Sequence, residues 1–311
     1  MKRLLALASI AGIAQFAGMT PAVAAPGPES ICSASSTVFC SGFEEGNFSL
    51  WDDWDGNPAP DNTNVAEPGP LNLADNHVTR MRVPAGRGGV DLTKVLPSTY
   101  DKLYVRYYQK WEQGFDFAAP NHGGGLHAGD RNLMGHDSYR PTGADWFSAW
   151  LEPLNGRLNL YTYYRGMYMD CTNPQGSCWG DHFPCFLDEG TNYCKKAAHR
   201  ERVMPPTLVT NRWYCLEYMV DAGSAVTSDA AANGSMNLWI DGTEYGPFEN
   251  LWFRTTANLK LNIHSIGIFH HGEHSVAGTE FDNLVISTQR IGCATPGATR
   301  KPNPPTNVNT N

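Results

Sequence analysis

Side chains alternate most clearly in the stretch Leu103-Tyr-Val-Arg-Tyr-Tyr-Gln-Lys-Trp111. Successive side chains of a β-strand point to opposite faces of a sheet, and aromatic and β-branched residues favour strands. The stretch therefore predicts a strand with two unlike faces. One face carries Tyr104, Arg106, Tyr108 and Lys110, and the other carries Val105, Tyr107, Gln109 and Trp111.

Strand-like segments recur on both sides of this stretch, at residues 43–51, 77–83, 146–151, 157–164, 212–220, 235–240, 259–269 and 279–287. Asn155-Gly156 and Asp241-Gly242 predict tight turns, and the 31 glycines and 21 prolines fit many strands joined by short connections. Residues 57–72 are rich in proline and asparagine and predict a surface loop. We expect one all-β domain over residues 42–293, built as a two-sheet β-sandwich or jelly roll.

Residues 1–25 have the layout of a bacterial signal peptide. Lys2 and Arg3 precede a short apolar run, and the small residues Ala22-Val-Ala-Ala25 fit a cleavage site. A membrane anchor is the alternative, but glycines and a proline interrupt the run, which is shorter than the ~18 apolar residues of a span. We expect a secreted or periplasmic protein with a leader at residues 26–41 and a disordered tail at 294–311.

The eight cysteines all follow the signal peptide, at positions 32, 40, 171, 178, 185, 194, 215 and 293. An even number in an exported chain favours disulfides. Short loops favour Cys32–Cys40, Cys171–Cys178 and Cys185–Cys194, which leaves Cys215 for Cys293. A metal cluster is the alternative, but these spacings do not match C-x-x-C knuckles. Four of the cysteines lie in residues 166–206, a disulfide-rich insertion of the kind that borders binding clefts.

The formal net charge is −8, and loss of Lys2 and Arg3 with the signal peptide would take it to about −10. An acidic protein has no general attraction for nucleic acid or for an anionic membrane. We expect neither as a partner, and we expect the chain to act as a monomer.

Several local motifs occur in the order found in a known group of proteins. They are Gly114-Phe-Asp-Phe117, His122-Gly-Gly-Gly-Leu-His127, Phe147-Ser148, Tyr161-x-Tyr163, Asn237-Leu-Trp-Ile-Asp-Gly242 and Phe281-Asp-Asn-Leu-Val-Ile-Ser287. This order resembles the concanavalin A-like jelly rolls of secreted polysaccharide lyases, especially the alginate and glucuronan lyases of families 14 and 20. The resemblance spans roughly residues 40–293. It implies β-elimination on a uronate-containing, acidic polysaccharide.

The resemblance implies a site on the concave sheet that contains Ser148, Tyr161 and Tyr163. Two positions depart from the family pattern. Gly125 stands where family 14 has a lysine, and Trp150 stands where the family has an arginine. The cations that would face the substrate carboxylate are therefore missing from their usual positions.

Other residues could take over these roles. A histidine could act as the base, and the candidates are His122, His127, His270 and His271. Arg165, Arg106 or Lys110 could face the carboxylate. We expect Tyr161, Tyr163, His127, His270 and Arg165 to be catalytic, and Arg106, Lys110, His122, Ser148, Trp150 and His271 to bind substrate. A solvated strand face is the alternative for Arg106 and Lys110, and stacking within the sheet is the alternative for the tyrosines.

The chain contains two groups of histidines, His122, His127 and His136, and His264, His270, His271 and His274. They could bind a transition metal if both groups met at one rim, although acid–base roles or sugar stacking explain them equally well. No HExxH motif is present. We expect no required cofactor, while a structural Ca²⁺ could brace the Asp-rich loop at residues 52–61.

Two other functions fit the same fold. A glycoside hydrolase needs a pair of placed carboxylates, but Glu217, Asp241, Glu244 and Glu273 are isolated in the sequence. A non-catalytic, lectin-like protein is the stronger alternative, because nine tryptophans and thirteen tyrosines supply stacking surfaces for sugars.

Overall fold

The computed structural model describes residues 29–54, 62–73, 75–83, 88–118, 121–135, 139–168, 179–185, 204–271 and 278–294. The expected signal peptide, the tail beyond residue 294, most of the Asp-rich loop at 52–61 and most of the cysteine-rich insertion lie outside the described residues. His136, Glu273 and His274 also lie outside them. In the described part the regular structure is β-strand apart from three short 3₁₀ turns, η1 (Ser30–Ser33), η2 (Arg131–Leu133) and η4 (Asp229–Ala231).

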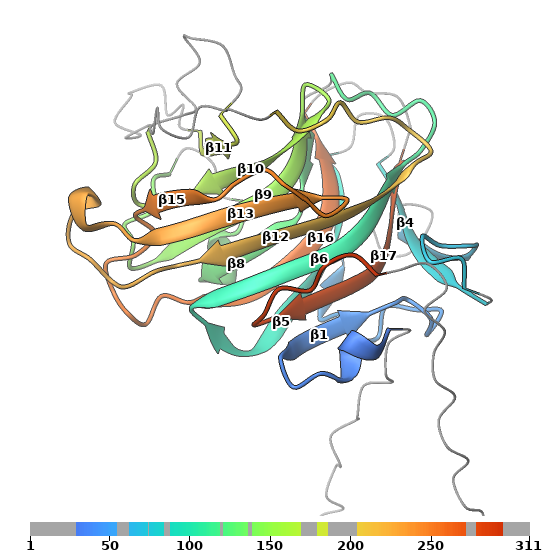
Figure 1. The fold of residues 1–311 in the computed structure, drawn as a ribbon, viewed down its shortest axis with the longest axis horizontal. Coiled ribbons are helices and arrows are strands. Elements are labelled where there is room, and N and C mark those ends of the chain that lie inside the picture. Colours follow the sequence, from blue (N-terminus) through green and yellow to red (C-terminus); the bar gives the residue numbers. More distant parts are fainter. Residues whose placement is uncertain are drawn as a thin grey trace, which may run out of the picture.

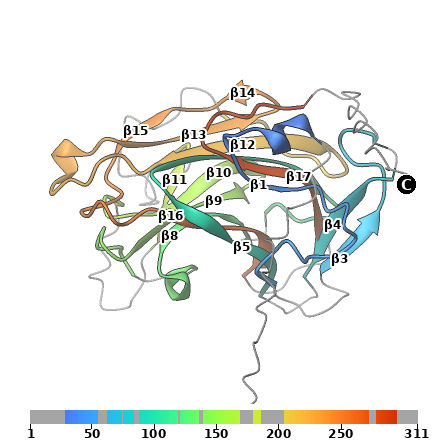
Figure 2. The ribbon, with the colours of Figure 1, turned by 90° about the horizontal axis from the view of Figure 1, so that it is seen from below.

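Two antiparallel sheets form the two layers of a sandwich (Figures 1 and 2). The nine-stranded sheet has the order β14-β13-β12-β6-β17-β4-β3, with β1 added beside β17 and β15 beside β13. Its strands are β1 (Thr37–Ser41), β3 (Asn62–Ala66), β4 (His77–Arg82), β6 (Lys102–Trp111), β12 (Trp213–Asp221), β13 (Gly234–Ile240), β14 (Thr243–Glu244), β15 (Phe248–Leu251) and β17 (Gly278–Ser287).

The eight-stranded sheet has the order β11-β10-β9-β8-β16-β5-β2, with β7 added beside β16. Its strands are β2 (Asp53–Trp54), β5 (Gly89–Tyr100), β7 (Asn121–Gly123), β8 (Gly125–Gly129), β9 (Trp146–Leu154), β10 (Arg157–Tyr163), β11 (Asp181–Phe183) and β16 (Leu261–His270). The predicted all-β, two-sheet fold is confirmed. β11 belongs to the cysteine-rich insertion, so part of that insertion extends the sheet beside β10.

The predicted faces of the central strand are also confirmed. Val105, Tyr107 and Trp111 of β6 belong to the apolar core between the sheets. Arg106 and Lys110 lie on the opposite, outer face, where they meet acidic partners. The alternation quoted from the sequence therefore decides which side of the nine-stranded sheet is buried.

Both predicted hairpin turns form. Asn155 and Gly156 have φ angles of 49° and 74°, and Asp241 and Gly242 have 50° and 81°. Positive φ at two successive positions is the requirement of a type I′ turn, which explains the Asn-Gly and Asp-Gly pairs.

Two sequence expectations at the N-terminal end were wrong. Residues 43–51 form turns instead of a strand: Phe43 and Gly46 adopt positive φ, and the Asn47 side chain accepts a hydrogen bond from the Ser49 amide. The first strand is instead β1, inside the segment expected to be a leader. Within the expected loop at 57–72, residues 62–66 pair with β4 as an edge strand.

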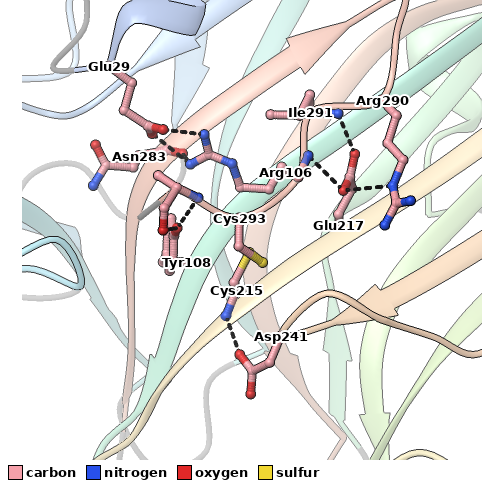
Figure 3. Close-up of a disulfide and its surroundings, with 12 residues drawn as sticks. Glu29, Arg106, Tyr108, Cys215, Glu217, Asp241, Asn283, Arg290, Ile291 and Cys293 are labelled. Carbon is pink, nitrogen blue, oxygen red and sulfur yellow. Dashed lines mark hydrogen bonds and ion pairs between the residues drawn. A yellow bond between two sulfur atoms is a disulfide. The ribbon is translucent and has the colours of Figure 1, made fainter. Parts of the chain in front are cut away.

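Both ends of the described chain are fastened to the outer face of the nine-stranded sheet (Figure 3). Cys215 of β12 is bonded to Cys293, as predicted. Next to this disulfide, the Glu217 carboxylate accepts hydrogen bonds from the backbone amides of Ile291 (2.7 Å) and Gly292 (3.0 Å).

At the N-terminal end, Arg106 holds Glu29 through two hydrogen bonds of 2.7 and 2.6 Å. The predicted Cys32–Cys40 bond forms as well. Cys185 is disulfide-bonded, but the predicted pairings Cys171–Cys178 and Cys185–Cys194 include cysteines outside the described residues.

Candidate functional site

A pocket of ≈ 500 Å³ opens on the outer face of the eight-stranded sheet. The residues that line it come from β5, β7, β9, β10 and β16 and from the connections beside them. They are Gly89, Val90, Asp91, His122, Gly123, Gly124, Met134, Gly135, Trp150, Tyr161, Tyr163, Trp179, Ser265, Gly267, Ile268, Phe269 and His271.

Strand register gathers the side chains of this region into two rows. Tyr163 of β10 pairs with Ser148 of β9, which pairs with His127 of β8. In the next row, Tyr161 pairs with Trp150. Because alternate residues of a strand share a face, the Tyr-x-Tyr motif presents both phenols on the pocket side. The family-like positions Ser148, Tyr161 and Tyr163 are therefore neighbours in the structure.

Tyr161 and Tyr163 share a hydrogen bond of 2.9 Å between their hydroxyl groups. The Tyr161 oxygen also accepts a hydrogen bond of 3.3 Å from the Gly180 amide. Burial raises the pKa of Tyr161, and the neighbouring Tyr163 and Glu152 raise it further. Tyr161 is therefore a protonated phenol at neutral pH and carries a proton that it could donate.

His122 lines the pocket and contacts several of its other side chains. Its Nδ1 lies 2.6 Å from Oε2 of Glu152, which is buried at the same side of β9 as Trp150. Its ring stacks on that of Tyr161 with centroids 5.1 Å apart and planes 6° apart. Its Nε2 lies 2.8 Å from Nε2 of the exposed His271.

Burial lowers the pKa of His122, but the charge of Glu152 and the hydrogen bond to it outweigh burial and raise the pKa overall. Burial also raises the pKa of Glu152, against the opposing effect of His122. A buried carboxylate at Nδ1 fixes the imidazole so that Nε2 can accept a proton. The pair is thus arranged as a general base with a residue that orients it.

Glu152, Asp91, His182, Trp179 and Phe269 belong to this region but were not among the sequence-based candidates. Glu152 could have been found, because it is two residues beyond Trp150 and so shares its face of the strand. His182 stacks on Tyr161 with centroids 4.6 Å apart, but it lies in the insertion, where the sequence showed no periodicity. Burial lowers its pKa to about 3.

Two predicted site residues lie beside the pocket but beneath its surface. Ser148 and His127 are fully buried. Nε2 of His127 donates to the carbonyl oxygen of Asp130 (2.9 Å), and its ring stacks on Trp146. Burial lowers the pKa of His127 to about 4, so this imidazole is neutral and committed to a structural contact.

His270 was assigned to the site, and this assignment is corrected. It is buried and packs against Phe115 in the core between the sheets, with ring centroids 5.6 Å apart. Its neighbours Phe269 and His271 line the pocket instead. Neighbouring residues of a strand point to opposite faces of the sheet, so a prediction that is off by one residue selects the wrong face.

The three predicted cations also lie elsewhere. Arg106 and Lys110 belong to the other sheet, where Arg106 binds Glu29 and Lys110 lies 2.7 Å from Glu67. Arg165 follows β10, but its guanidinium stacks on Trp252 at 5.1 Å. The pocket-lining residues in the described part of the chain include no lysine or arginine.

The histidine groups of the sequence are divided between the two faces of the sheet. His264 is buried on the core side, where its Nδ1 lies 3.3 Å from the Tyr218 hydroxyl. Among the described residues, no three histidine, cysteine, aspartate or glutamate side chains are placed to hold a metal ion.

The two sheets form a jelly-roll sandwich, and this fold is similar to that of solved polysaccharide lyases of the alginate and glucuronan type. Three solved structures show this similarity of fold. They are an alginate lyase from Chlorella virus (TM-score 0.53, 13% identity, covering 76% of this chain and 93% of that one), the PL-14 alginate lyase from Aplysia kurodai (0.54, 14%, 82% and 100%) and an endo-β-1,4-glucuronan lyase from Trichoderma reesei (0.51, 12%, 81% and 96%). No protein-family model matches the chain, and a search of curated proteins found no match.

Proposed function

We propose that the protein is a polysaccharide lyase that cleaves a uronate-containing polysaccharide by β-elimination. The observation that carries this proposal is the stacking of the His122–Glu152 pair on the Tyr161–Tyr163 pair within one pocket. A base and an acid are two of the groups that this elimination requires. The fold shared with three lyases of polyuronates supports the same reaction class.

In this reaction the exposed His271, whose Nε2 lies 2.8 Å from Nε2 of His122, gives way to the substrate. Nε2 of neutral His122 then takes the proton from C5 of the uronosyl residue. The electrons of that C–H bond form a double bond between C4 and C5, and the C4–O bond breaks. The hydroxyl pair of Tyr161 and Tyr163 supplies the proton to the departing oxygen. Glu152 stabilises the imidazolium that forms, and exchange with solvent restores both groups for the next turnover.

We propose that the protein acts outside the cytoplasm, as a monomer and without a cofactor. The signal-like residues 1–25 and the disulfides Cys32–Cys40 and Cys215–Cys293 support export. No helix among the described residues is long and apolar enough to span a membrane.

The test is incubation with alginate, glucuronan and related polyuronates while the ultraviolet absorbance of the unsaturated product is followed. We expect product with the native protein. Tyr161→Phe should lower the rate by about 10²–10⁴-fold, because it removes a positioned proton donor. Tyr104→Phe is the matched control, since Tyr104 lies on β6 in the other sheet, and it should leave the rate unchanged. Normal turnover by Tyr161→Phe would remove Tyr161 from the mechanism.

A lectin-like binder is the second candidate, and one feature favours it. Phe269 is an apolar side chain left 41% exposed in the pocket, near Trp150 and His122. Exposed aromatic faces bind sugar rings without any reaction. Retained binding to a polyuronate, with no unsaturated product from any polymer, would select this function over the lyase.

A further inference from the structure

Four aromatic rings form a row across the outer face of the eight-stranded sheet. His182 of β11 pairs with Tyr161 of β10, and its ring stacks on that of Tyr161 with centroids 4.6 Å apart. Tyr161 stacks on His122 of β7 at 5.1 Å. His122 in turn pairs with Phe269 of β16, with ring centroids 6.2 Å and planes 28° apart. The row therefore runs across the strands and contains both the proposed acid and the proposed base.

The rings become more exposed along this row. His182 and Tyr161 are buried, and His122 is half-buried. Phe269, at the other end, is 41% exposed. A single exposed apolar side chain is ordinary on a protein surface, but Phe269 lines the pocket directly beside the proposed base. The row thus ends in an aromatic ring that a ligand in the pocket can reach.

The position of the Phe269 ring depends on two glycines at the start of β5. A Cβ atom on Gly88 would lie 2.8 Å from Cε2 of Phe269, and one on Gly89 would lie 2.9 Å from its Cδ2. The ring therefore occupies space that a side chain at either position would take. With His122 stacked on it from the other direction, the ring is ordered before a ligand arrives, which lowers the entropic cost of binding.

An ordered aromatic ring of this kind is suited to a pyranose. The C–H groups of a sugar ring gain free energy when they are buried against an aromatic ring. His122 and Phe269 occupy successive places in the row, so one sugar ring cannot react at His122 and stack on Phe269 as well. The ring on Phe269 must belong to the next residue of the polysaccharide.

We propose that Phe269 is the stacking platform of a separate subsite, which binds the sugar residue on the reducing-end side of the one that reacts. This inference rests on the proposed lyase function, which places the reacting residue at His122. The C4–O bond breaks beside Tyr161, so C4 of the reacting sugar faces β10. C1 lies at the opposite end of a pyranose and points along the row towards Phe269. The polysaccharide therefore crosses the strands from β10 towards β5.

The experiment uses uronate tetramers prepared from alginate and from glucuronan, with early products separated by length and identified by mass. β-Elimination leaves the double bond on the fragment from the reducing-end side, so the length of the unsaturated product reports which bond was cleaved. The native protein should form mainly unsaturated products of two or more residues, because these cleavages place a sugar on Phe269. Phe269→Ala should raise KM by about three- to tenfold and increase the share of unsaturated monosaccharide.

Two further variants separate the platform from general effects on the fold. Gly88→Ala moves the ring without removing it, because the three atoms nearest to the new Cβ all belong to Phe269. The Gly88 carbonyl oxygen can still accept its hydrogen bond of 2.7 Å from the His270 amide, and the products should shift in the same direction as in Phe269→Ala. Tyr104→Ala is the matched control, since it removes an aromatic ring from β6 of the other sheet, and it should leave the products unchanged.

The outcomes distinguish this subsite from the lyase activity itself. Unchanged products and KM in Phe269→Ala would overturn the subsite and leave the lyase proposal standing. A lower kcat with an unchanged product pattern would also overturn the subsite, because it would show that Phe269 only supports His122. If the native protein forms no unsaturated product from any polyuronate, both proposals fail.

Discussion

Replacing Glu152 by glutamine removes the charge that orients His122 while keeping the size of the side chain. In the native protein Glu152 accepts a hydrogen bond from Nδ1 over 2.6 Å, which leaves Nε2 as the proton acceptor. A glutamine amide can instead donate to Nδ1 and place the ring proton on Nε2. The imidazole would then present the wrong atom to the substrate.

A positioned general base contributes about 10²–10⁴-fold to a rate. We therefore expect Glu152→Gln to lower kcat by a factor in this range, about 3–5 kcal/mol at 1.36 kcal/mol per factor of ten. Glu152 is buried behind His122, out of reach of a substrate in the pocket, so we expect KM to change much less than kcat.

The pH profile provides a second readout. His122 must be neutral to act as a base, and Glu152 holds its pKa above the ordinary 6.5. The native rate should fall as the pH drops through this raised pKa. In Glu152→Gln the stabilising charge is gone while burial still lowers the pKa, so the fall on the acid side should move to lower pH.

The assay is initial-rate formation of the unsaturated product across a pH series at saturating substrate. Glu249→Gln is the control, because Glu249 is an exposed carboxylate on β15 of the other sheet. An unchanged kcat together with an unmoved acid limb in Glu152→Gln would refute the assignment of His122 as the base.

Three further predictions concern stability. Cys293→Ser opens a disulfide that spans 78 residues, so the free energy of unfolding should fall by about 4–5 kcal/mol, measured by urea titration; a loss below about 1 kcal/mol would contradict the bond's role in fastening the C-terminal end. Arg106→Met leaves the Glu29 carboxylate without its partner under the N-terminal segment. The free energy of unfolding should fall by about 3–5 kcal/mol in the same urea titration. An unchanged unfolding midpoint would show that the pair does not stabilise the fold. Burial lowers the pKa values of three imidazoles from 6.5 to about 4 or about 3. As the pH falls below 6.5, the unfolded state therefore binds protons before the folded state does, and Tm should decrease. A Tm that stays constant down to pH 4 would contradict their neutral, buried state. They are His127, His182 and His264.

Much of the fold followed from local patterns. Alternation in residues 103–111 identified both the strand β6 and its buried face, since the period of two is a property of the extended chain itself. Asn155-Gly156 and Asp241-Gly242 identified their turns because positive φ is demanded by the turn and tolerated by few residues. The same logic failed at residues 43–51, where a side-chain hydrogen bond and positive φ stabilise turns although Phe43, Phe48, Leu50 and Trp51 are apolar.

The site was predictable in part. Tyr161, Tyr163 and His122 were predicted from motifs that fix residue type and spacing within single strands, and all three line the pocket. His270 and the cations were misplaced, because a histidine pair such as His270-His271 does not reveal which member faces the pocket. That choice depends on the register of β16 against β5 and β7.

By itself, the sequence determined the fold class and the face of the clearly alternating strand, and it favoured the disulfides Cys32–Cys40 and Cys215–Cys293 that the structure contains. These are consequences of short-range periodicity, turn chemistry and cysteine spacing. Only the tertiary structure decided that Glu152 meets His122, that His122 stacks on Tyr161, and that Arg106 and Lys110 belong to the other sheet. The pairing of β7, β9, β10 and β16 brings these groups together from distant parts of the chain, and no local pattern encodes which strand lies beside which.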